Sequence, residues 1–150
     1  MTHTRAEPRA AGPSRAGEIL ARDLTCQTLG IRIEEIAPGR ASLHMRVTDS
    51  MVNGHGIAHG GYLFLLADAA FAYASNTHGP TAVAQSAQIT FLRPAFVGDA
   101  LLAEAVERTR QGRVGLYDVT VRRADGPAVA EFRGHCVLLP AGRALDPLQE

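Results

Sequence analysis

The sequence predicts an α+β fold in which a strongly curved antiparallel sheet wraps around one long buried helix. One apolar run, from His59 to Asn76, has the length of a helix and carries almost no polar side chains. After Thr81 the hydrophobic pattern changes to period two in four consecutive segments, which is typical of half-buried strands. The connections between these segments are too short to hold crossover helices, so we expect consecutive strands to pair as an antiparallel meander.

The N-terminal part predicts a tail followed by a short helix. Residues 1–15 are rich in Ala, Pro and Arg and lack the apolar core of a secretory signal, so we expect a flexible tail. Residues 16–29 carry apolar side chains at helical spacing, with Ser14 as a candidate cap and Gly30 as a candidate stop. One domain is expected over residues 16–140 and a second loose tail over 141–150.

The remaining segments alternate apolar and polar residues, as strands do. Two strands are expected at 31–37 and 41–47, with a turn at Pro38 and Gly39 between them. The four later strands are expected at residues 81–94, 99–110, 114–123 and 128–139. Strands of about ten residues are longer than usual, and a sheet of such strands twists and curls. The long helix is the element it would curl around.

Composition excludes several classes of partner. Fifteen basic residues balance fifteen acidic ones, which leaves no electrostatic footprint for nucleic acid or an anionic membrane. Cys26 and Cys136 lie far apart without metal-ligand spacing, which indicates neither a disulfide framework nor a zinc site. The apolar run 57–74 contains Asp68, His59 and two glycines, and this argues against a membrane span. We expect a cytoplasmic protein.

The long helix is apolar on nearly every side. A helix without a polar face is buried all round, and one bent sheet covers only part of it. We therefore expect the remaining surface to lie against another subunit, in a homodimer at least.

Asp68 stands inside this apolar run. An ionised carboxylate on a buried helix is costly unless it is paired or used, and no Lys or Arg lies three or four residues away. Two interpretations stay open: Asp68 bonds a backbone group or faces a wet subunit boundary, or it is a nucleophile or general base.

Two glycines, Gly60 and Gly61, begin the same helix after His59. Glycine in a first helical turn costs roughly 1 kcal/mol relative to alanine, so the pair needs a reason. Bare N–H groups at a helix start can accept an anion or a developing oxyanion; tight packing against a strand is the alternative. His59 either orients a group by a hydrogen bond or is structural.

Spacing separates the two candidate groups. Gly60 and Asp68 are eight residues apart, about 12 Å along a helix axis, whereas an oxyanion donor and an attacking group both lie within about 3 Å of one carbonyl. If both are catalytic, Gly60 of one subunit meets Asp68 of its partner across two antiparallel helices.

Two further polar residues have open interpretations. Asn53 lies in the glycine-rich segment "NGHG", where it either makes a turn, holds the loop before the helix or touches the substrate. Ser86 falls in a strand among small side chains, where it either binds the attacking water or is an ordinary strand serine. No GxSxG elbow, metal-ligand cluster or phosphate-binding glycine loop is present in the sequence.

Three blocks of the sequence resemble a known family. "VNGHGIAHGGYLFLLADAAFAYASN", "ITFLRPAFVGD" and "GLYDVTV" followed by "AEFRG" are similar to the phenylacetyl-CoA thioesterases of the hotdog-fold superfamily. The resemblance covers about residues 30–138. It implies the hotdog fold with five or six strands around a central helix, dimers that pair into tetramers, and hydrolysis of aryl-acyl or acyl coenzyme A thioesters without metal or cofactor.

The resemblance also implies roles for individual residues. Asp68 matches the nucleophile or general base, and Gly60 matches the amide donor to the thioester carbonyl. His59 and Asn53 match residues that support that end of the site. Ser86 matches the position at which some relatives hold the water from the partner chain.

Substrate contacts follow from the same resemblance. Arg93 stands where relatives often carry a basic residue for the coenzyme A phosphates, and an ion pair with Asp99 is an equally plausible role. Gly61, beside Gly60, is placed with the substrate-binding residues. An apolar acyl pocket is expected from Leu63, Leu66 and Phe71.

Two other functions remain alternatives. A hotdog acyl-CoA hydratase or dehydratase needs an acid and a base that converge on the α and β carbons, and His59 cannot reach Asp68 of its own helix. A non-catalytic acyl-CoA sensor would keep the fold but would not need Asp68.

Overall fold

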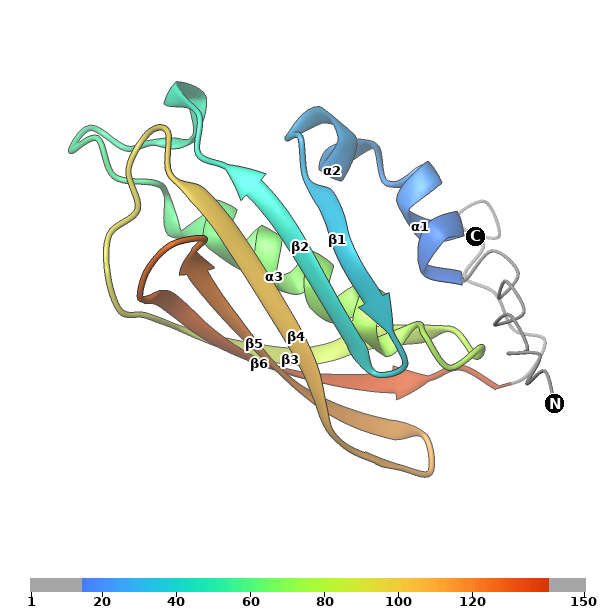
Figure 1. Ribbon diagram of the computed structural model, residues 1–150. Coiled ribbons are helices and arrows are strands. Elements are labelled where there is room, and N and C mark those ends of the chain that lie inside the picture. Colours follow the sequence, from blue (N-terminus) through green and yellow to red (C-terminus); the bar gives the residue numbers. More distant parts are fainter. Residues whose placement is uncertain (1–14, 141–150) are drawn as a thin grey trace, which may run out of the picture.

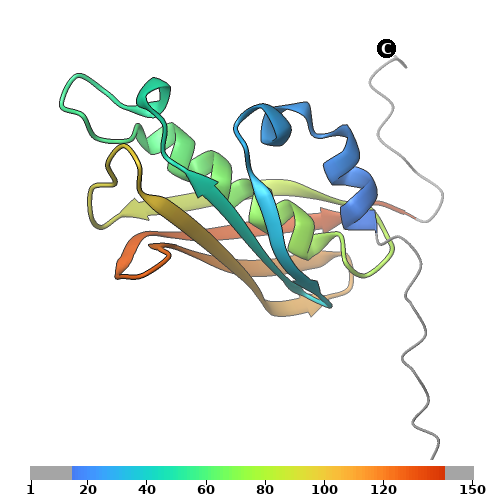
Figure 2. The same ribbon diagram turned by 45° about the horizontal axis from the view of Figure 1, so that its top comes forward.

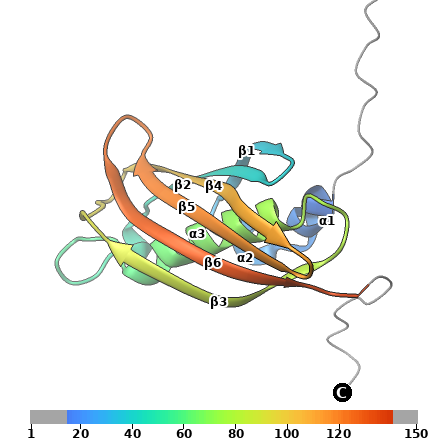
Figure 3. The ribbon, with the colours of Figure 1, turned by 90° about the horizontal axis from the view of Figure 1, so that it is seen from below.

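The computed structural model describes residues 15–140, which form a six-stranded antiparallel sheet curled around one long helix (Figure 1). The strands are β1 (Arg32–Ala37), β2 (Arg40–Arg46), β3 (Ala82–Phe91), β4 (Ala100–Gln111), β5 (Val114–Arg123) and β6 (Ala128–Leu138). Seen from below, the sheet bends over helix α3 (Gly60–Ser75), with β3 at one edge and β1 toward the other (Figure 3). The predicted α+β fold with a curved sheet around a central helix is confirmed.

The predicted meander is wrong for one strand. The order in the sheet is β1-β2-β4-β5-β6-β3, so β3 pairs with β6 and not with β4, the next strand in sequence. Residues 92–99 connect β3 to β4 across the end of the sheet. Eight residues reach about 26 Å when extended, and three inter-strand spacings take about 14 Å. The connection that looks like a local turn is therefore long enough to pass β6 and β5.

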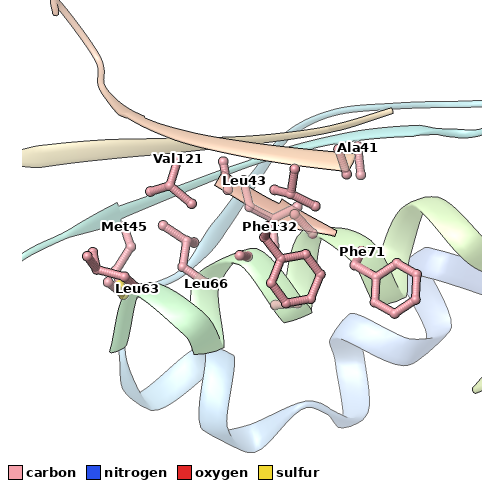
Figure 4. Close-up of a cluster of buried hydrophobic side chains, with 14 of the residues drawn as sticks. Ala41, Leu43, Met45, Leu63, Leu66, Phe71, Val121 and Phe132 are labelled. Atoms are coloured by element: carbon pink, nitrogen blue, oxygen red, sulfur yellow. The ribbon is translucent and has the colours of Figure 1, made fainter. Parts of the chain in front are cut away.

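Helix α3 forms the centre of the core. Its inward face packs on the sheet, as Figure 4 shows for Leu63, Leu66 and Phe71 beside strand residues such as Leu43 and Val121. Leu66 is 0% exposed and Phe71 is 1% exposed. Each such side chain contributes about 1.5–3 kcal/mol on burial. The expected helical run from His59 to Asn76 is confirmed, because these two residues are the N-cap and the C-cap of α3.

The predicted N-terminal helix over 16–29 is broken in two. Helix α1 (Arg15–Arg22) ends at Asp23, and α2 (Leu24–Thr28) begins after it. The Cys26 N–H donates to Oδ1 of Asp23 over 2.9 Å, and the Tyr73 hydroxyl donates to its other oxygen over 3.2 Å. Asp23 thus caps α2 and ties it to α3, and both short helices lie beside α3 (Figure 2). The Asp23 cap interrupts the helix at this point, and the hydrogen bond from Tyr73 stabilises the interruption.

Three predicted features lie outside the described residues. These are the tails at 1–14 and 141–150 and the candidate cap Ser14; Arg15, assigned to the tail, begins α1. Gly30 follows α2 with a φ of 69°, in the left-handed region expected of a helix stop. The turn at Pro38 and Gly39 is confirmed between β1 and β2, with Gly39 at a φ of 70°.

One side of α3 is not covered by its own sheet. Gly61 is exposed, and Leu65, Asp68 and Ala72 are half-buried, at spacings that place them along one side of the helix. Strand β3 borders this side, and its outer edge has no neighbouring strand within residues 15–140.

Cys26 and Cys136 are buried and free. No helix within residues 15–140 is long and apolar enough to span a membrane.

Candidate active site

Asn53 shapes the loop that leads into α3. Its side-chain Oδ1 accepts the N–H of His55 over 2.9 Å and that of Ile57 over 3.2 Å, while its own N–H donates to the Ile57 carbonyl. Two backbone hydrogen bonds then anchor the end of the loop, directly before α3. Ala58 N–H donates to Ala95 O, and His59 N–H donates to Met51 O. Of the interpretations left open by the sequence, the geometry favours the one in which Asn53 holds this loop.

The first turn of α3 offers unbonded amides. Within residues 15–140, neither the Gly60 N–H nor the Gly61 N–H donates a hydrogen bond. His59, the N-cap residue, is exposed and makes no capping bond with its side chain. The first N–H groups of a helix lack intrahelical acceptors, and the helix dipole favours negative charge there. The start of α3 can therefore hold an oxyanion.

A cavity of about 440 Å³ opens beside these amides. Its walls come from the loop before α3, the first turn of α3, the end of β3 and the segment after it. The lining residues are Ile57, Ala58, Gly60, Leu63, Phe91, Leu92, Arg93, Pro94 and Ala95. The structure thus brings together three predicted site residues, Gly60, Leu63 and Arg93, in a mostly apolar pocket. An acyl or pantetheine chain suits such a lining.

The predicted acyl pocket needs correction at two positions. Leu66 and Phe71 were expected to line it with Leu63, but both lie in the core between α3 and the sheet (Figure 4). Phe71 packs against Tyr117 and Phe132, with ring centroids 5.6 Å and 5.8 Å away. Helix periodicity turns residues 66 and 71 toward the sheet. Residues after β3 form the wall instead, and of these only Arg93 was selected from the sequence.

Two arginines hold that wall. Arg93 donates from Nη1 to the Ala128 carbonyl over 2.7 Å. The alternative ion pair between Arg93 and Asp99 is absent, because Asp99 accepts the Phe96 N–H and lies 3.5 Å from Nε of Arg123. Arg123 also donates to the Pro94 carbonyl over 3.0 Å. No local pattern indicates this role for Arg123, since it comes from β5, about 30 residues after the wall.

Asp68 is half-buried on the uncovered side of α3. Burial raises the pKa of its carboxyl above the ordinary value. It makes no hydrogen bond or ion pair with any part of the chain that the structure describes. Helix α3 is unbroken from Gly60 to Ser75, so Gly60 and Asp68 remain about 12 Å apart along its axis. One protomer does not bring these two groups to the same carbonyl.

Ser86 lies on the opposite face of the sheet from α3. Its Oγ is 3.1 Å from Nδ1 of His135, the residue opposite it on β6. His135 alternates with Gly134, whose α-carbon faces the Phe71 ring, so His135 and Ser86 both point outward. The structure does not bring Ser86 to Asp68. Sequence reasoning missed His135, although alternation along 128–138 places it on the outer face.

The described residues hold no cluster of three His, Cys, Asp or Glu side chains suited to a metal ion. The expectation that no metal or cofactor takes part stays a prediction.

Comparisons with known proteins identify relatives over most of the chain. Residues 55–130 match the family model described as "Thioesterase superfamily". The acyl-coenzyme A thioesterase PaaI of Escherichia coli K12 is 46% identical over 112 residues, which are 75% of this chain and 80% of that protein.

Solved structures show the same similarity. The structure of the E. coli PaaI protein from the phenylacetic acid degradation operon aligns with a TM-score of 0.82 and 42% identity, covering 83% of this chain and 91% of that one. A Streptococcus mutans UA159 protein solved with acetyl CoA bound aligns with a TM-score of 0.70 and 27% identity, covering 73% and 88% of the two chains.

Proposed function

The chain belongs to the thioesterase superfamily, as a PaaI-type member with the hotdog fold. We propose that it hydrolyses acyl-CoA thioesters and that phenylacetyl-CoA and related aryl esters are its substrate class. The observation that carries the proposal is the pair of unbonded amides, Gly60 and Gly61, beside an apolar cavity of about 440 Å³. Such a site suits a thioester, whose carbonyl develops negative charge during attack.

The proposed reaction uses groups from two subunits. The Gly60 N–H donates to the thioester oxygen, and Asp68 of the partner subunit acts on the carbonyl carbon. Either the carboxylate attacks, expels the coenzyme A thiolate and leaves a mixed anhydride that water hydrolyses, or it takes a proton from the water that attacks. The raised pKa of Asp68 supports a role as a proton acceptor.

Assembly into at least a homodimer follows from this chemistry. The uncovered side of α3, with Gly61 and Asp68 on it, and the unpaired outer edge of β3 are adjacent surfaces that a second copy would cover. An antiparallel pair of α3 helices gives two equivalent sites. We propose further that two dimers pair into a tetramer, as the family resemblance implies.

The remaining predicted residues support this site. Asn53 and His59 hold the segment that leads to the amides, Gly61 leaves the helix start open, and Leu63 forms the apolar floor. Arg93 is exposed at the cavity and has further N–H groups beside the one bonded to Ala128, which can meet the coenzyme A phosphates.

Ser86 is proposed to hold the attacking water in the partner's site. Its bond to His135 points it away from α3. A water-holding role in the partner's site requires the β3 bulge between Ala84 and Ser86 to rearrange when two subunits pair.

Replacing the acid tests the function. We expect Asp68→Asn to lower the kcat for thiol release from phenylacetyl-CoA by at least about 100-fold, since general-base catalysis contributes on that order. Binding of the ester, followed by calorimetry, should persist. Asp125→Asn, in the exposed turn between β5 and β6, is the matched control and should retain wild-type turnover. Unchanged turnover in Asp68→Asn would contradict the assignment.

Isotope labelling separates the two chemical routes. A single turnover in oxygen-18 water puts label into the Asp68 carboxylate only if that group forms the anhydride, because water then attacks the carbonyl of either partner in it. Mass spectrometry of the peptide that contains Asp68 measures this. Label in Asp68 would establish the anhydride route, whereas label confined to the released acid would show that water attacks the acyl carbonyl.

A further inference from the structure

Phe91 has an unusual position at the end of the edge strand β3. Its side chain is 52% exposed, although it stands opposite Ala130, a fully buried residue of β6. Alternation along both strands turns Phe91 toward the α3 side of the sheet. The ring lines the same cavity as Gly60. It therefore forms part of the site and contributes little to the packed core.

The ring touches the proposed oxyanion donor. A methyl group placed on Gly60 would lie 2.6 Å from Cζ of Phe91 and 3.0 Å from Cε1, closer than real side chains approach. At Gly61 the same methyl group would meet nothing within 4 Å. The two glycines therefore have different reasons to be present. A side chain at position 60 would displace the tip of the Phe91 ring, whereas Gly61 faces open space.

This contact limits how a substrate can reach the amide. The ring lies against one side of Gly60, and a hydrogen bond to an oxyanion is stronger where a neighbouring ring displaces water. A thioester whose carbonyl bonds the Gly60 amide lies next to this ring. A substituent on the α carbon of the acyl group, the atom bonded to that carbonyl, is the group that meets this wall first.

We propose that Phe91 is a positioning and specificity-determining residue that holds the thioester carbonyl against the Gly60 amide and excludes acyl groups branched at the α carbon. This inference rests on the proposed thioesterase function and adds a selectivity that the function itself does not require. Phenylacetyl-CoA, with an unbranched α carbon, fits beside the ring. 2-Phenylpropionyl-CoA, with one additional methyl group on that carbon, does not.

Selectivity gives the first test. We expect Phe91→Ala to raise the ratio of kcat/KM for 2-phenylpropionyl-CoA over phenylacetyl-CoA by about 10-fold, within the usual effect of one methyl group in a fitted pocket. Phe96→Ala is the matched control, since Phe96 is a similarly exposed ring, 44% exposed, that does not line the cavity. It should leave the ratio as in the wild type. An unchanged ratio in Phe91→Ala would overturn the proposal.

A double-mutant cycle gives the second test. Gly60→Ala keeps the backbone N–H but should push the Phe91 ring into the cavity, and we expect the displaced ring to keep the carbonyl from the amide and lower kcat/KM for phenylacetyl-CoA by about 100-fold, the order of losing one oxyanion donor. Adding Phe91→Ala removes the clash, so the double variant should regain about 10-fold over Gly60→Ala, which a merely structural ring would not produce. Phe96→Ala should give no such recovery. The positioning role would be refuted if the losses in kcat/KM of Gly60→Ala and Phe91→Ala simply added in the double variant. It would also be refuted if Gly60→Ala kept the wild-type kcat/KM.

The experiment also separates this inference from the function on which it rests. If the proposed function is wrong, the wild-type protein will release no thiol from either ester. The inference is then decided by binding of the two non-hydrolysable analogues in which a methylene replaces the thioester sulfur. Phe91→Ala should reduce the ratio of the Kd for the branched analogue to the Kd for the unbranched one by about 10-fold. The same ratio in wild type and variant would overturn the inference. The selectivity tests need no change at Gly60 and remain decisive if Gly60→Ala does not fold.

Discussion

At the scale of single residues, Asp68 combines a proposed catalytic role with a cost to the fold. Its carboxyl is half-buried, has no hydrogen bond or ion pair within residues 15–140, and has a pKa raised by burial. A carboxyl whose folded pKa lies above its unfolded pKa destabilises the folded state once the pH rises above the unfolded value. Active sites commonly carry this kind of local instability.

Asp68→Asn should therefore be more stable than the wild type at neutral pH. The amide has no charge to desolvate, so we expect a gain of about 1 kcal/mol in the free energy of unfolding at pH 7. The gain should shrink as the pH falls toward the ordinary carboxyl pKa of 3.8, where the wild-type carboxyl is protonated in both states. Urea titrations followed by circular dichroism at both pH values measure it. A variant less stable than the wild type at pH 7 would show that the carboxylate is stabilised by a partner.

At the scale of elements, Asp23 decides how the N-terminal segment meets α3. Its two carboxylate oxygens accept from different elements, the Cys26 N–H of α2 and the Tyr73 hydroxyl of α3. Burial raises the pKa of the Tyr73 hydroxyl, which keeps it protonated and able to donate. One side chain thus joins a local cap to a long-range contact.

Removing this carboxylate should loosen α1 and α2 without changing the site. Asp23→Ala loses the cap and leaves the buried hydroxyl without its acceptor, for which we expect a loss of about 1–2 kcal/mol in unfolding free energy. Asp23→Asn is the matched control, because its amide oxygen still caps α2. Thermal unfolding and proteolysis near residue 23 measure the change. Equal stability of the alanine and wild-type proteins would show that the bond to Tyr73 contributes nothing.

At the scale of the whole molecule, the proposed site is divided between two subunits. The uninterrupted α3 keeps Gly60 and Asp68 about 12 Å apart along one helix, so a complete site requires a second chain. The cavity, the amides and the wall after β3 all belong to one protomer. In the proposed reaction, the partner subunit contributes the acid.

Mixing two inactive variants tests this division. When Asp68→Asn and Gly60→Ala chains are unfolded together and refolded, a mixed dimer holds one site with an unobstructed Gly60 amide and an intact acid. Random pairing makes half of the dimers mixed, so we expect about a quarter of wild-type turnover from the equimolar mixture. Each variant refolded alone is the control. A mixture no more active than its two components would exclude a site shared between subunits.

Local patterns in the sequence were sufficient for the long helix and the six strands. The apolar run ends in the caps His59 and Asn76, and period-two alternation located the six strands, because helix and strand periods are properties of neighbouring residues. The glycine pair at the helix start pointed to Gly60, and the family resemblance supplied Leu63 and Arg93; the fold brings all three to one cavity. The geometric separation of Gly60 and Asp68 also followed from helix rise alone.

Contacts between distant segments were decided only by the tertiary structure. β3 pairs with β6 instead of β4, Asp99 pairs with Arg123 instead of Arg93, and the Phe91 ring lies on Gly60. These choices depend on how a curled sheet closes over a helix, which brings together residues more than 20 positions apart. Periodicity carries no information about such partners, since it records which face a residue occupies and not what lies opposite that face.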